Sequence, residues 1–216
     1  MLISIMKKLN LLLAFLVAAT FSSCITTQQS GTSMLEKNSL GKWKPTDFAG
    51  HGDVTVKNGV LKLGMGIELT GVNWTGELPA GEYEISFEGR RVQGNDFFCG
   101  LTFPVKDSHA TLILGGWGGA LVGISSLDNL DAAENETGDI YVFEDGEWYA
   151  ITLRVQKNRI RVWIKDKEQI DVDLTDRKVG MRIGEIEQSM PLGIATWMTG
   201  SEIRKIQIRD FIEGEK

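Results

Sequence analysis

The sequence predicts an all-β protein, and three observations support this fold class. Hydrophobic and polar residues alternate with a period of two along most of the chain after residue 50, which is typical of strands with one buried face. Gly, Asn and Asp residues interrupt the alternation at short intervals, and hardly any segment keeps helical spacing over three turns. We therefore expect two packed antiparallel sheets in a jelly-roll sandwich, with a closed barrel as the second choice.

The first clear element is a hairpin at DVTVKNGVLKLG. Val54 and Val56 alternate with polar residues, and Asn58 and Gly59 follow before a second strand at 60–63. Asn-Gly readily takes the positive φ angles of a tight hairpin turn. Further strands are expected at 66–70, 82–92, 97–103, 110–114, 120–125, 148–156, 160–165, 169–174, 179–183, 192–197 and 203–211.

The stretch 148–174 is the clearest meander. Its three strands each carry apolar residues on one face, and the opposite faces hold mainly Thr, Arg, Lys and Asp. One side of this sheet is therefore expected to be buried and the other wet.

The strand EYEISFEGRRV suggests a polar groove. Glu88 and Arg90 point away from the predicted core face, although a plain solvent face is the better interpretation for Glu84 and Ser86 on the same side. A glycine turn then places Asn95 and Asp96 at the head of a very apolar strand. Charges beside an aromatic-rich strand favour a half-sheltered site.

An acidic loop at 125–139, SSLDNLDAAENETGD, interrupts the strand pattern. It contains Glu134, Asn135 and Glu136, and long irregular loops in compact β domains are often functional. A solvated loop is equally compatible with the composition. A calcium site is a further alternative, but the loop lacks the regular spacing of calcium-binding loops.

The stretch GGWGG at 115–119 places Trp117 between two pairs of glycines. Its ring could present a face to the apolar C–H side of a sugar; the alternative is a core or hairpin tryptophan. We expect Trp117 to border one groove together with Arg90, Glu134 and Glu136.

The N-terminal residues 1–23 have the features of a secretory signal peptide. Lys7 and Lys8 precede an apolar run from Leu9 to Phe21 that is too short for a transmembrane helix. The following FSSC resembles the lipobox of bacterial lipoproteins, although Phe21 stands where an aliphatic residue is usual. The resemblance implies export and a lipid on Cys24 that anchors the protein in the cell envelope, facing the periplasm or at the outer membrane. An ordinary signal peptide cut nearby is the alternative.

The rest of the chain suits one domain. Residues 24–40 are polar and weakly patterned, as in a flexible tether, which leaves residues 41–213 for the sandwich. Without residues 1–23, which hold two of the 23 basic residues and none of the 29 acidic ones, the formal charge is −8. Such a chain is a poor partner for nucleic acid, and Cys99, the one cysteine besides Cys24, is expected to be buried.

Several common catalytic motifs are absent from the sequence. It contains no G-x-S-x-G, no P-loop and no H-E-x-x-H, and its only histidines, His51 and His109, are far apart in the chain. It also lacks the E-x-D-x-E strand of glucanases, so retaining hydrolysis by two carboxylates has no supporting motif.

Three stretches together resemble the bacterial 3-keto-disaccharide hydrolase domain family. They are LTGVNWTGELPAGEYEISFEGRRVQGNDFFCGLTFPV, GGWGGALVGISSLDNLDAAENET and PLGIATWMTGSEIRKIQIRDF, and the resemblance spans roughly residues 40–212. It implies a concanavalin A-like jelly roll, a carbohydrate ligand on the concave sheet and, for active members, cleavage of glycosides whose C3 hydroxyl has been oxidised to a ketone.

The chemistry implied by the resemblance needs a base and a cation. A C3 ketone acidifies the hydrogen on C2, so a general base can remove it, and the C1 substituent then leaves before water adds. By residue type, the candidate bases are Glu134, Glu136 and Asp96, and Arg90 is the candidate cation. Candidate sugar-binding residues are Trp117, Trp74, Glu88, Asn95 and Asn135.

Two points stay open at this stage. The cofactor is unknown, although a divalent metal could polarise the ketone. Because fold does not fix function, a lectin-like envelope lipoprotein that binds carbohydrate without catalysis is the alternative to an enzyme.

Overall fold

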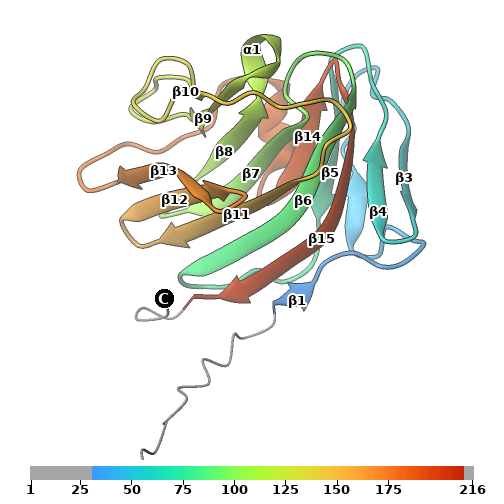
Figure 1. Ribbon diagram of the computed structural model, residues 1–216. Coiled ribbons are helices and arrows are strands. Elements are labelled where there is room, and N and C mark those ends of the chain that lie inside the picture. Colours follow the sequence, from blue (N-terminus) through green and yellow to red (C-terminus); the bar gives the residue numbers. More distant parts are fainter. Residues whose placement is uncertain (1–30, 212–216) are drawn as a thin grey trace, which may run out of the picture.

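A computed structural model describes residues 31–211 (Figure 1). The strands are β1 (Thr32–Ser33), β2 (Trp43–Pro45), β3 (Val54–Lys57), β4 (Val60–Leu63), β5 (Leu69–Trp74), β6 (Tyr83–Gln93), β7 (Cys99–Val105), β8 (Ser108–Gly115), β9 (Leu121–Ser125), β10 (Asp139–Ile140), β11 (Tyr149–Gln156), β12 (Arg159–Ile164), β13 (Lys167–Asp173), β14 (Gly193–Trp197) and β15 (Gly200–Asp210). Within the described residues, the helices are α1 (Gly116–Gly119) and the 3₁₀ helix η1 (Glu185–Ser189).

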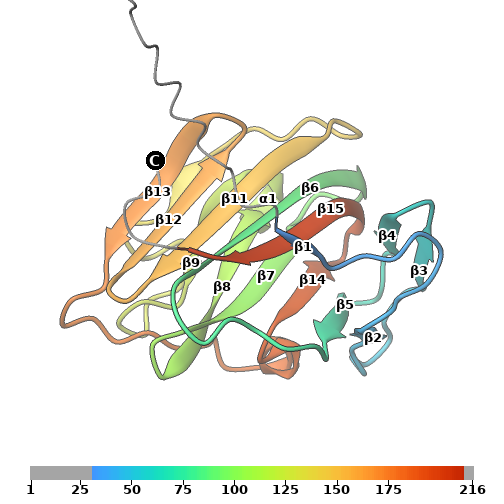
Figure 2. The ribbon, with the colours of Figure 1, turned by 90° about the horizontal axis from the view of Figure 1, so that it is seen from below.

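The strands form two antiparallel sheets that pack face to face (Figures 1 and 2). Sheet A has the order β13-β12-β11-β6-β15-β4-β3, with β1 paired to β15. Sheet B has the order β10-β9-β8-β7-β14-β5-β2. Strands that are neighbours in a sheet are often distant in the chain, as β14 is from both β5 and β7. This two-sheet sandwich confirms the predicted fold class.

The main hydrophobic core lies between the two sheets. Alternate residues of β6 and β11, such as Ile85 and Leu153, face inward from sheet A. Leu101 and Leu112 face them from β7 and β8 of sheet B. The hydrophobic residues of the period-two alternation are therefore those that face the core in each strand. Cys99 belongs to this core and is fully buried, as expected, and burial raises the pKa of its thiol.

The outer face of sheet A is charged and braced by ion pairs. Glu84 binds both Arg154 and Arg209, and Glu88 binds Arg204 and Lys205. Arginines also stack on half-buried rings: the guanidinium carbon of Arg204 lies 3.9 Å from the Trp148 ring centroid. This outer face is therefore polar and can remain in contact with solvent.

The outer face of sheet B is largely apolar instead, with a few hydroxyl side chains such as Thr111 and Ser125. A second hydrophobic cluster covers it, with Phe48, Leu69, Phe97, Ile113, Leu121, Ala132 and Ala195 buried, and Ile186 and Trp197 packed against them. A sheet that is apolar on both faces needs cover on its outer side, and loops supply part of that cover here.

The predicted hairpin is confirmed. Strands β3 and β4 pair with Lys57 opposite Val60, and Asn58 and Gly59 between them both have positive φ, 53° and 73°. Such angles are those of the tight turn that Asn-Gly favours.

One predicted strand is wrong. Residues 179–183 form no strand; Val179 makes only an isolated bridge to Leu127, and the chain then runs over sheet B as an irregular segment. Its short apolar alternation does not mark a buried face: Val179 belongs to the main core, whereas Ile183 is 91% exposed. Very short strands, such as β1 and β10, carry no periodic signal and escaped prediction.

Part of the predicted tether belongs to the domain. In β1, Thr32 pairs with Ile208 of β15, and Met34 is buried. The Met34 carbonyl also accepts a 2.8 Å hydrogen bond from the Trp43 indole. The predicted signal peptide, Cys24 and the rest of the tether lie outside the described residues.

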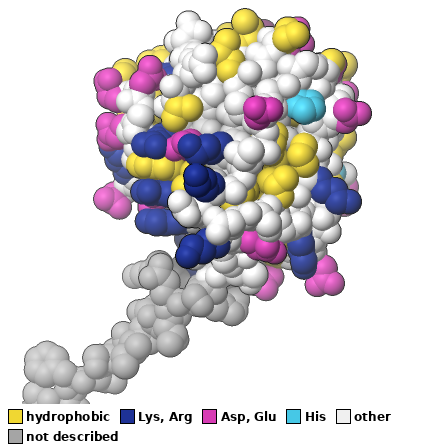
Figure 3. Space-filling view, turned by 90° about the vertical axis from the view of Figure 1, so that its right-hand side faces the viewer, with side chains coloured by type: hydrophobic (Ala, Val, Ile, Leu, Met, Phe, Trp, Pro, Cys, Tyr) yellow, Lys and Arg dark blue, Asp and Glu magenta, His cyan; other side chains and the backbone are white. Residues whose placement is uncertain are grey.

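The surface beside β3 and β4 carries charges of both signs (Figure 3). Lys and Arg side chains lie next to Asp and Glu there, with hydrophobic side chains between them. Neither of the two short helices in residues 31–211 is long and apolar enough to cross a membrane.

The core predicts a large effect for Phe98→Ala. Phe98 is fully buried, and its ring packs edge-on against Phe143 at a centroid distance of 5.0 Å. Removing a buried phenylalanine ring costs about 3–5 kcal/mol of stability, so we expect a loss of that size in chemical denaturation. Ile140→Ala, at a side chain that is 67% exposed, is the control and should change stability by less than about 0.5 kcal/mol. Equal losses would contradict this account of the core.

Candidate functional site

A cavity of about 470 Å³ opens on the outer face of sheet B. Side chains from several strands of this sheet form its floor: Leu69, Thr111, Ile113, Ser125 and Trp197. Other segments complete its walls with Glu68, Asp96, Phe97, Trp117, Arg182, Ile183, Gly184, Glu185 and Ile186. A mainly apolar cavity with a few polar groups is the usual form of a small-molecule site.

Trp117 stands at the wall of this cavity on the one-turn helix α1. Its side chain is 48% exposed, so the ring is displayed rather than buried between the sheets. Its φ angle of 47° lies in the left-handed region, as do those of Gly115, Gly118 and Gly119. The glycines of GGWGG therefore allow a left-handed turn that few other sequences would tolerate.

The turn is held from inside the protein by Arg91. Its guanidinium donates hydrogen bonds to the Gly119 carbonyl at 3.0 Å, the Phe143 carbonyl at 2.7 Å and the Asp145 carboxylate at 2.6 Å. The Arg91 side chain is only 10% exposed. Because these hydrogen bonds involve a buried charge, they are stronger than neutral ones, and they fix the position of Trp117.

Arg182 supplies the cavity with a positive charge. It comes from the segment 181–186, which is irregular up to the start of η1 at Glu185, and its guanidinium carbon lies 5.5 Å from the Trp117 ring centroid. The same guanidinium forms an ion pair with Asp131 of the acidic loop. A ligand in the cavity would therefore meet an aromatic ring and a guanidinium side by side.

Three carboxylates line the cavity: Glu68, Asp96 and Glu185. Asp96 is the most firmly placed, because its Oδ1 accepts a 2.7 Å hydrogen bond from the Phe97 amide and its own amide donates to Thr199 at 3.1 Å. Among residues 31–211, none of the three makes an ion pair within 4.0 Å. Each can thus face a ligand as a charged acceptor.

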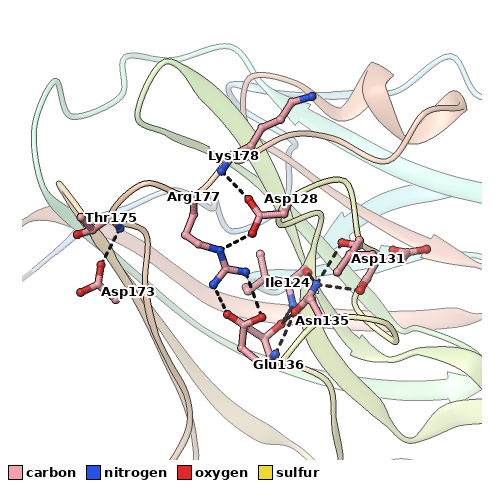
Figure 4. A network of polar contacts seen from close by, with 11 residues as sticks. Ile124, Asp128, Asp131, Asn135, Glu136, Asp173, Thr175, Arg177 and Lys178 are labelled. Atoms are coloured by element: carbon pink, nitrogen blue, oxygen red, sulfur yellow. Dashed lines mark hydrogen bonds and ion pairs between the residues drawn. The ribbon is translucent and has the colours of Figure 1, made fainter.

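Glu136 of the acidic loop serves an ion-pair network outside the cavity lining (Figure 4). Arg177 binds the carboxylates of Glu136 and Asp128 together. These contacts lower the pKa of Glu136, chiefly through the hydrogen bonds from Arg177. The carboxylate is therefore a weak base, and it binds another part of the chain.

The other loop residues named above also act within the loop. The Asn135 amide donates to the carbonyls of Ile124 and Asp131, each at 2.8 Å (Figure 4). Glu134 is exposed and accepts a 3.2 Å hydrogen bond from the Asp131 amide. Glu134 and Asn135, like Glu136, do not line the cavity.

The expected convergence of Arg90 with Trp117 is wrong, and the candidate sugar-binding residue Glu88 does not line the cavity either. Both side chains lie on the outer face of sheet A, where Glu88 binds Arg204 and Arg90 binds Glu202. The alternation of β6 assigns them to the face away from the core, but it does not tell which sheet the strand joins. Sheet B, not sheet A, carries the cavity.

Of the remaining candidate residues from the sequence, two line the cavity and two do not. Asp96 and Trp117 line the cavity, whereas Trp74 and Asn95 do not. The Trp74 ring packs against Trp43 at a centroid distance of 5.2 Å, and its indole donates to the Glu77 carbonyl at 3.2 Å. Asn95 is exposed in the turn before Asp96.

Sequence reasoning missed Arg182 and Glu185, which reach the cavity from segment 181–186. The sequence pattern predicted only a strand at 179–183, which assigned no functional role to Arg182 or Glu185. A signal was available in the sequence: the glycines at 180 and 184 flank Arg182, and Glu185 follows directly, a combination typical of a surface loop.

The described residues do not fit the divalent metal considered above. Within residues 31–211, no three His, Cys, Asp or Glu side chains are arranged to hold a metal ion. The cavity does combine carboxylates, a guanidinium and hydroxyls, which suits proton abstraction beside a developing negative charge.

The sequence matches the family of the 3-keto-alpha-glucoside-1,2-lyase-like domain over residues 31–209. The chain belongs to this family. The match includes β1 to β15 almost completely and every segment that lines the cavity. A search of curated proteins found no match.

Solved structures with the same fold are distant in sequence. The carbohydrate recognition domain of Emp47p is 12% identical with a TM-score of 0.56, and the alignment covers 85% of this chain and 95% of that one. A candidate glycosyl hydrolase from Parabacteroides distasonis is 11% identical, with a TM-score of 0.53 and coverages of 85% and 94%. The carbohydrate-binding module CBM66 from Bacillus subtilis is 10% identical, with a TM-score of 0.50 and coverages of 78% and 96%. At these identities the likeness establishes the concanavalin-like jelly-roll fold.

The glycine turn gives a matched pair of substitutions. Gly118 and Gly119 have φ angles of 91° and 100°, so alanine at either position costs about 1–2 kcal/mol in backbone strain. A Cβ at Gly118 would have no atom within 4 Å, whereas one at Gly119 would lie 2.7 Å from the Arg91 Nη1. We expect Gly119→Ala to lose clearly more stability than Gly118→Ala in chemical denaturation. Equal losses would mean that Arg91 does not hold the turn.

Proposed function

We propose that this protein is an exported enzyme that cleaves 3-keto glycosides in the cavity on sheet B. The observation that carries the proposal is the meeting of Asp96, Trp117 and Arg182 in one cavity, in a chain of the 3-keto-alpha-glucoside-1,2-lyase-like family. The fold shared with a carbohydrate recognition domain and a carbohydrate-binding module supports a sugar ligand.

The first chemical step assigned to this site is removal of the C2 proton by Asp96. A ketone at C3 acidifies that proton, and the carboxylate is fixed at the cavity wall by the Phe97 amide. The electrons left on C2 move onto the C3 oxygen as an enolate. Arg182 provides the positive charge that stabilises this oxygen, in a cavity where apolar walls strengthen the interaction.

The second step breaks the C1–O bond. The enolate re-forms the C3 ketone as a double bond forms between C1 and C2, and the departing oxygen takes the proton that Asp96 removed from C2. Asp96 then accepts a proton from the water that adds at C1 and returns it to C2, which gives the free 3-keto sugar. Trp117 and Trp197 offer aromatic surface to the C–H faces of the sugar rings during both steps.

A carbohydrate-binding protein without catalysis is the second candidate function. The observation that favours it is the apolar and aromatic lining, in which Ile113, Trp117 and Trp197 supply binding surface but no chemistry. In this case the same cavity would bind unoxidised sugars, and the carboxylates would accept hydrogen bonds from sugar hydroxyls.

The proposed reaction predicts a deuterium effect and a specific loss of activity. Purified protein should cleave a 3-keto disaccharide but not the matching unoxidised one, and deuterium at C2 should slow turnover because the base breaks that C–H bond. Asp96→Asn should reduce kcat by at least about 10²-fold, the lower range for a general base. The measurement is release of reducing sugar over time.

The controls are the other carboxylates that line the cavity. Glu68→Gln and Glu185→Gln should keep most of the activity; a loss in one of them with activity kept in Asp96→Asn would assign the base to that residue instead. Binding of the disaccharide that depends on Trp117, without turnover of either sugar, would favour the second candidate function.

We also propose that the protein is carried to the cell envelope and anchored by a lipid on Cys24. Support comes from the basic pair, the apolar run and FSSC at residues 1–24. When the full chain is expressed in bacteria with a labelled fatty acid, the wild type should take up label and fractionate with membranes, whereas Cys24→Ser should not be labelled. Labelling of Cys24→Ser, or an unlabelled wild type, would refute the anchor.

A further inference from the structure

A carboxylate behind the cavity wall binds two polar groups of the cavity at once. Asp131 forms an ion pair with Arg182, and the Ser125 hydroxyl donates a hydrogen bond to its Oδ1. The same oxygen accepts a 3.0 Å hydrogen bond from the Ala132 amide. Arg182 and Ser125 line the cavity, but Asp131 does not. It therefore touches the walls of the site without facing the ligand.

Asp131 is held more firmly than Arg182. Its side chain is 16% exposed, whereas that of Arg182 is 56% exposed. A long exposed arginine side chain has many rotamers, so its direction depends on what it binds. The buried carboxylate is therefore the fixed partner, and the guanidinium is the group that it orients.

The loop that carries Asp131 is itself fixed to the segment that carries Arg182. The amides of Ser126 and Gly180 donate to each other's carbonyls at 2.8 and 3.2 Å. The Lys178 amide donates to Asp128 at 2.8 Å, and Arg177 joins the loop through Glu136 (Figure 4). The acidic loop and the segment 177–182 thus form one connected unit, and Asp131 contacts the two residues of this unit that line the cavity, Ser125 and Arg182.

We propose that Asp131 is a positioning residue that holds the Arg182 guanidinium beside Trp117 and toward the C3 oxygen of the substrate. This inference rests on the proposed function for the identity of the substrate. An ionised carboxylate can only accept hydrogen bonds, so the Ser125 hydroxyl must be the donor in its hydrogen bond with Asp131. Ser125 consequently presents lone pairs to the cavity and recognises a sugar hydroxyl as a donor.

The test is a double-mutant cycle between Asp131→Asn and Arg182→Gln. Asparagine keeps the shape and an acceptor for Ser125 but removes the charge that orients Arg182. We expect Asp131→Asn to lower kcat on a 3-keto disaccharide by about 10²-fold, the cost of a misplaced group in a reaction site, with a smaller change in KM. In the Arg182→Gln background, Asp131→Asn should then cause little further loss, because the two residues act as a unit.

Glu136→Gln is the matched control. It removes an ion pair from the same loop, but one that contacts Arg177 rather than the cavity. It should leave kcat unchanged. A loss in Glu136→Gln equal to that in Asp131→Asn, or fully additive losses in the double mutant, would overturn the proposal in favour of general stabilisation of the loop.

A spectroscopic measurement separates this proposal from the proposed function. Because the guanidinium lies over the Trp117 ring, Asp131→Asn and Arg182→Gln should change the near-ultraviolet circular dichroism in the same way, and neither change should occur in a Trp117→Phe background. If the wild type has no activity but this pattern is found, the positioning role stands and the reaction does not. If Asp131→Asn leaves the Trp117 signal unchanged, the positioning role is refuted whether or not the enzyme is active.

Discussion

Sheet B carries hydrophobic clusters on both faces, and the rest of the molecule depends on this constraint. Its inner face packs in the main core, and its outer face carries a second hydrophobic cluster that includes Phe97 and Ile113. Water cannot cover such a surface without a large cost in free energy. Helix α1, the acidic loop and the segment 181–186 supply part of the cover, and the cavity is the part of the sheet that they leave open.

The outer face of sheet A is polar, in contrast to that of sheet B. This face is charged, and many of its charges are arranged in partly exposed ion pairs such as those of Arg159 with Asp171 and Arg161 with Glu168. Exposed ion pairs contribute little stability one by one. They do keep this sheet polar and separate from the ligand side, so the two outer faces differ in role because they differ in polarity.

The sequence predicted the strands well because alternation depends on local burial. It assigned Glu88 and Arg90 to the face away from the core, which is where they lie, but the sheet to which β6 belongs is set by pairing with β11 and β15, far along the chain. Arg91, one residue later, has the opposite direction and reaches the turn of Trp117. Which of two adjacent arginines serves the site could not be read from composition.

The cavity residues that escaped prediction come from segments outside the strands. Arg182 and Glu185 belong to no strand, and Asp131 gains its importance only from contact with a segment some fifty positions later in the chain. By contrast, Asp96 and Trp117 were found because each stands in an unusual local pattern beside a strand. Tertiary contacts of loops leave no periodic trace in a sequence, and this explains the difference.

The irregular walls of the cavity have a consequence for how this protein can diversify. Trp117, Arg182 and Glu185 all lie on segments that connect strands, while the floor is made by the sheet itself. Changes in loop length or sequence are tolerated far better than changes in paired strands. Relatives could therefore acquire different ligand preferences by replacing these connections, with the same sandwich inherited unchanged beneath them.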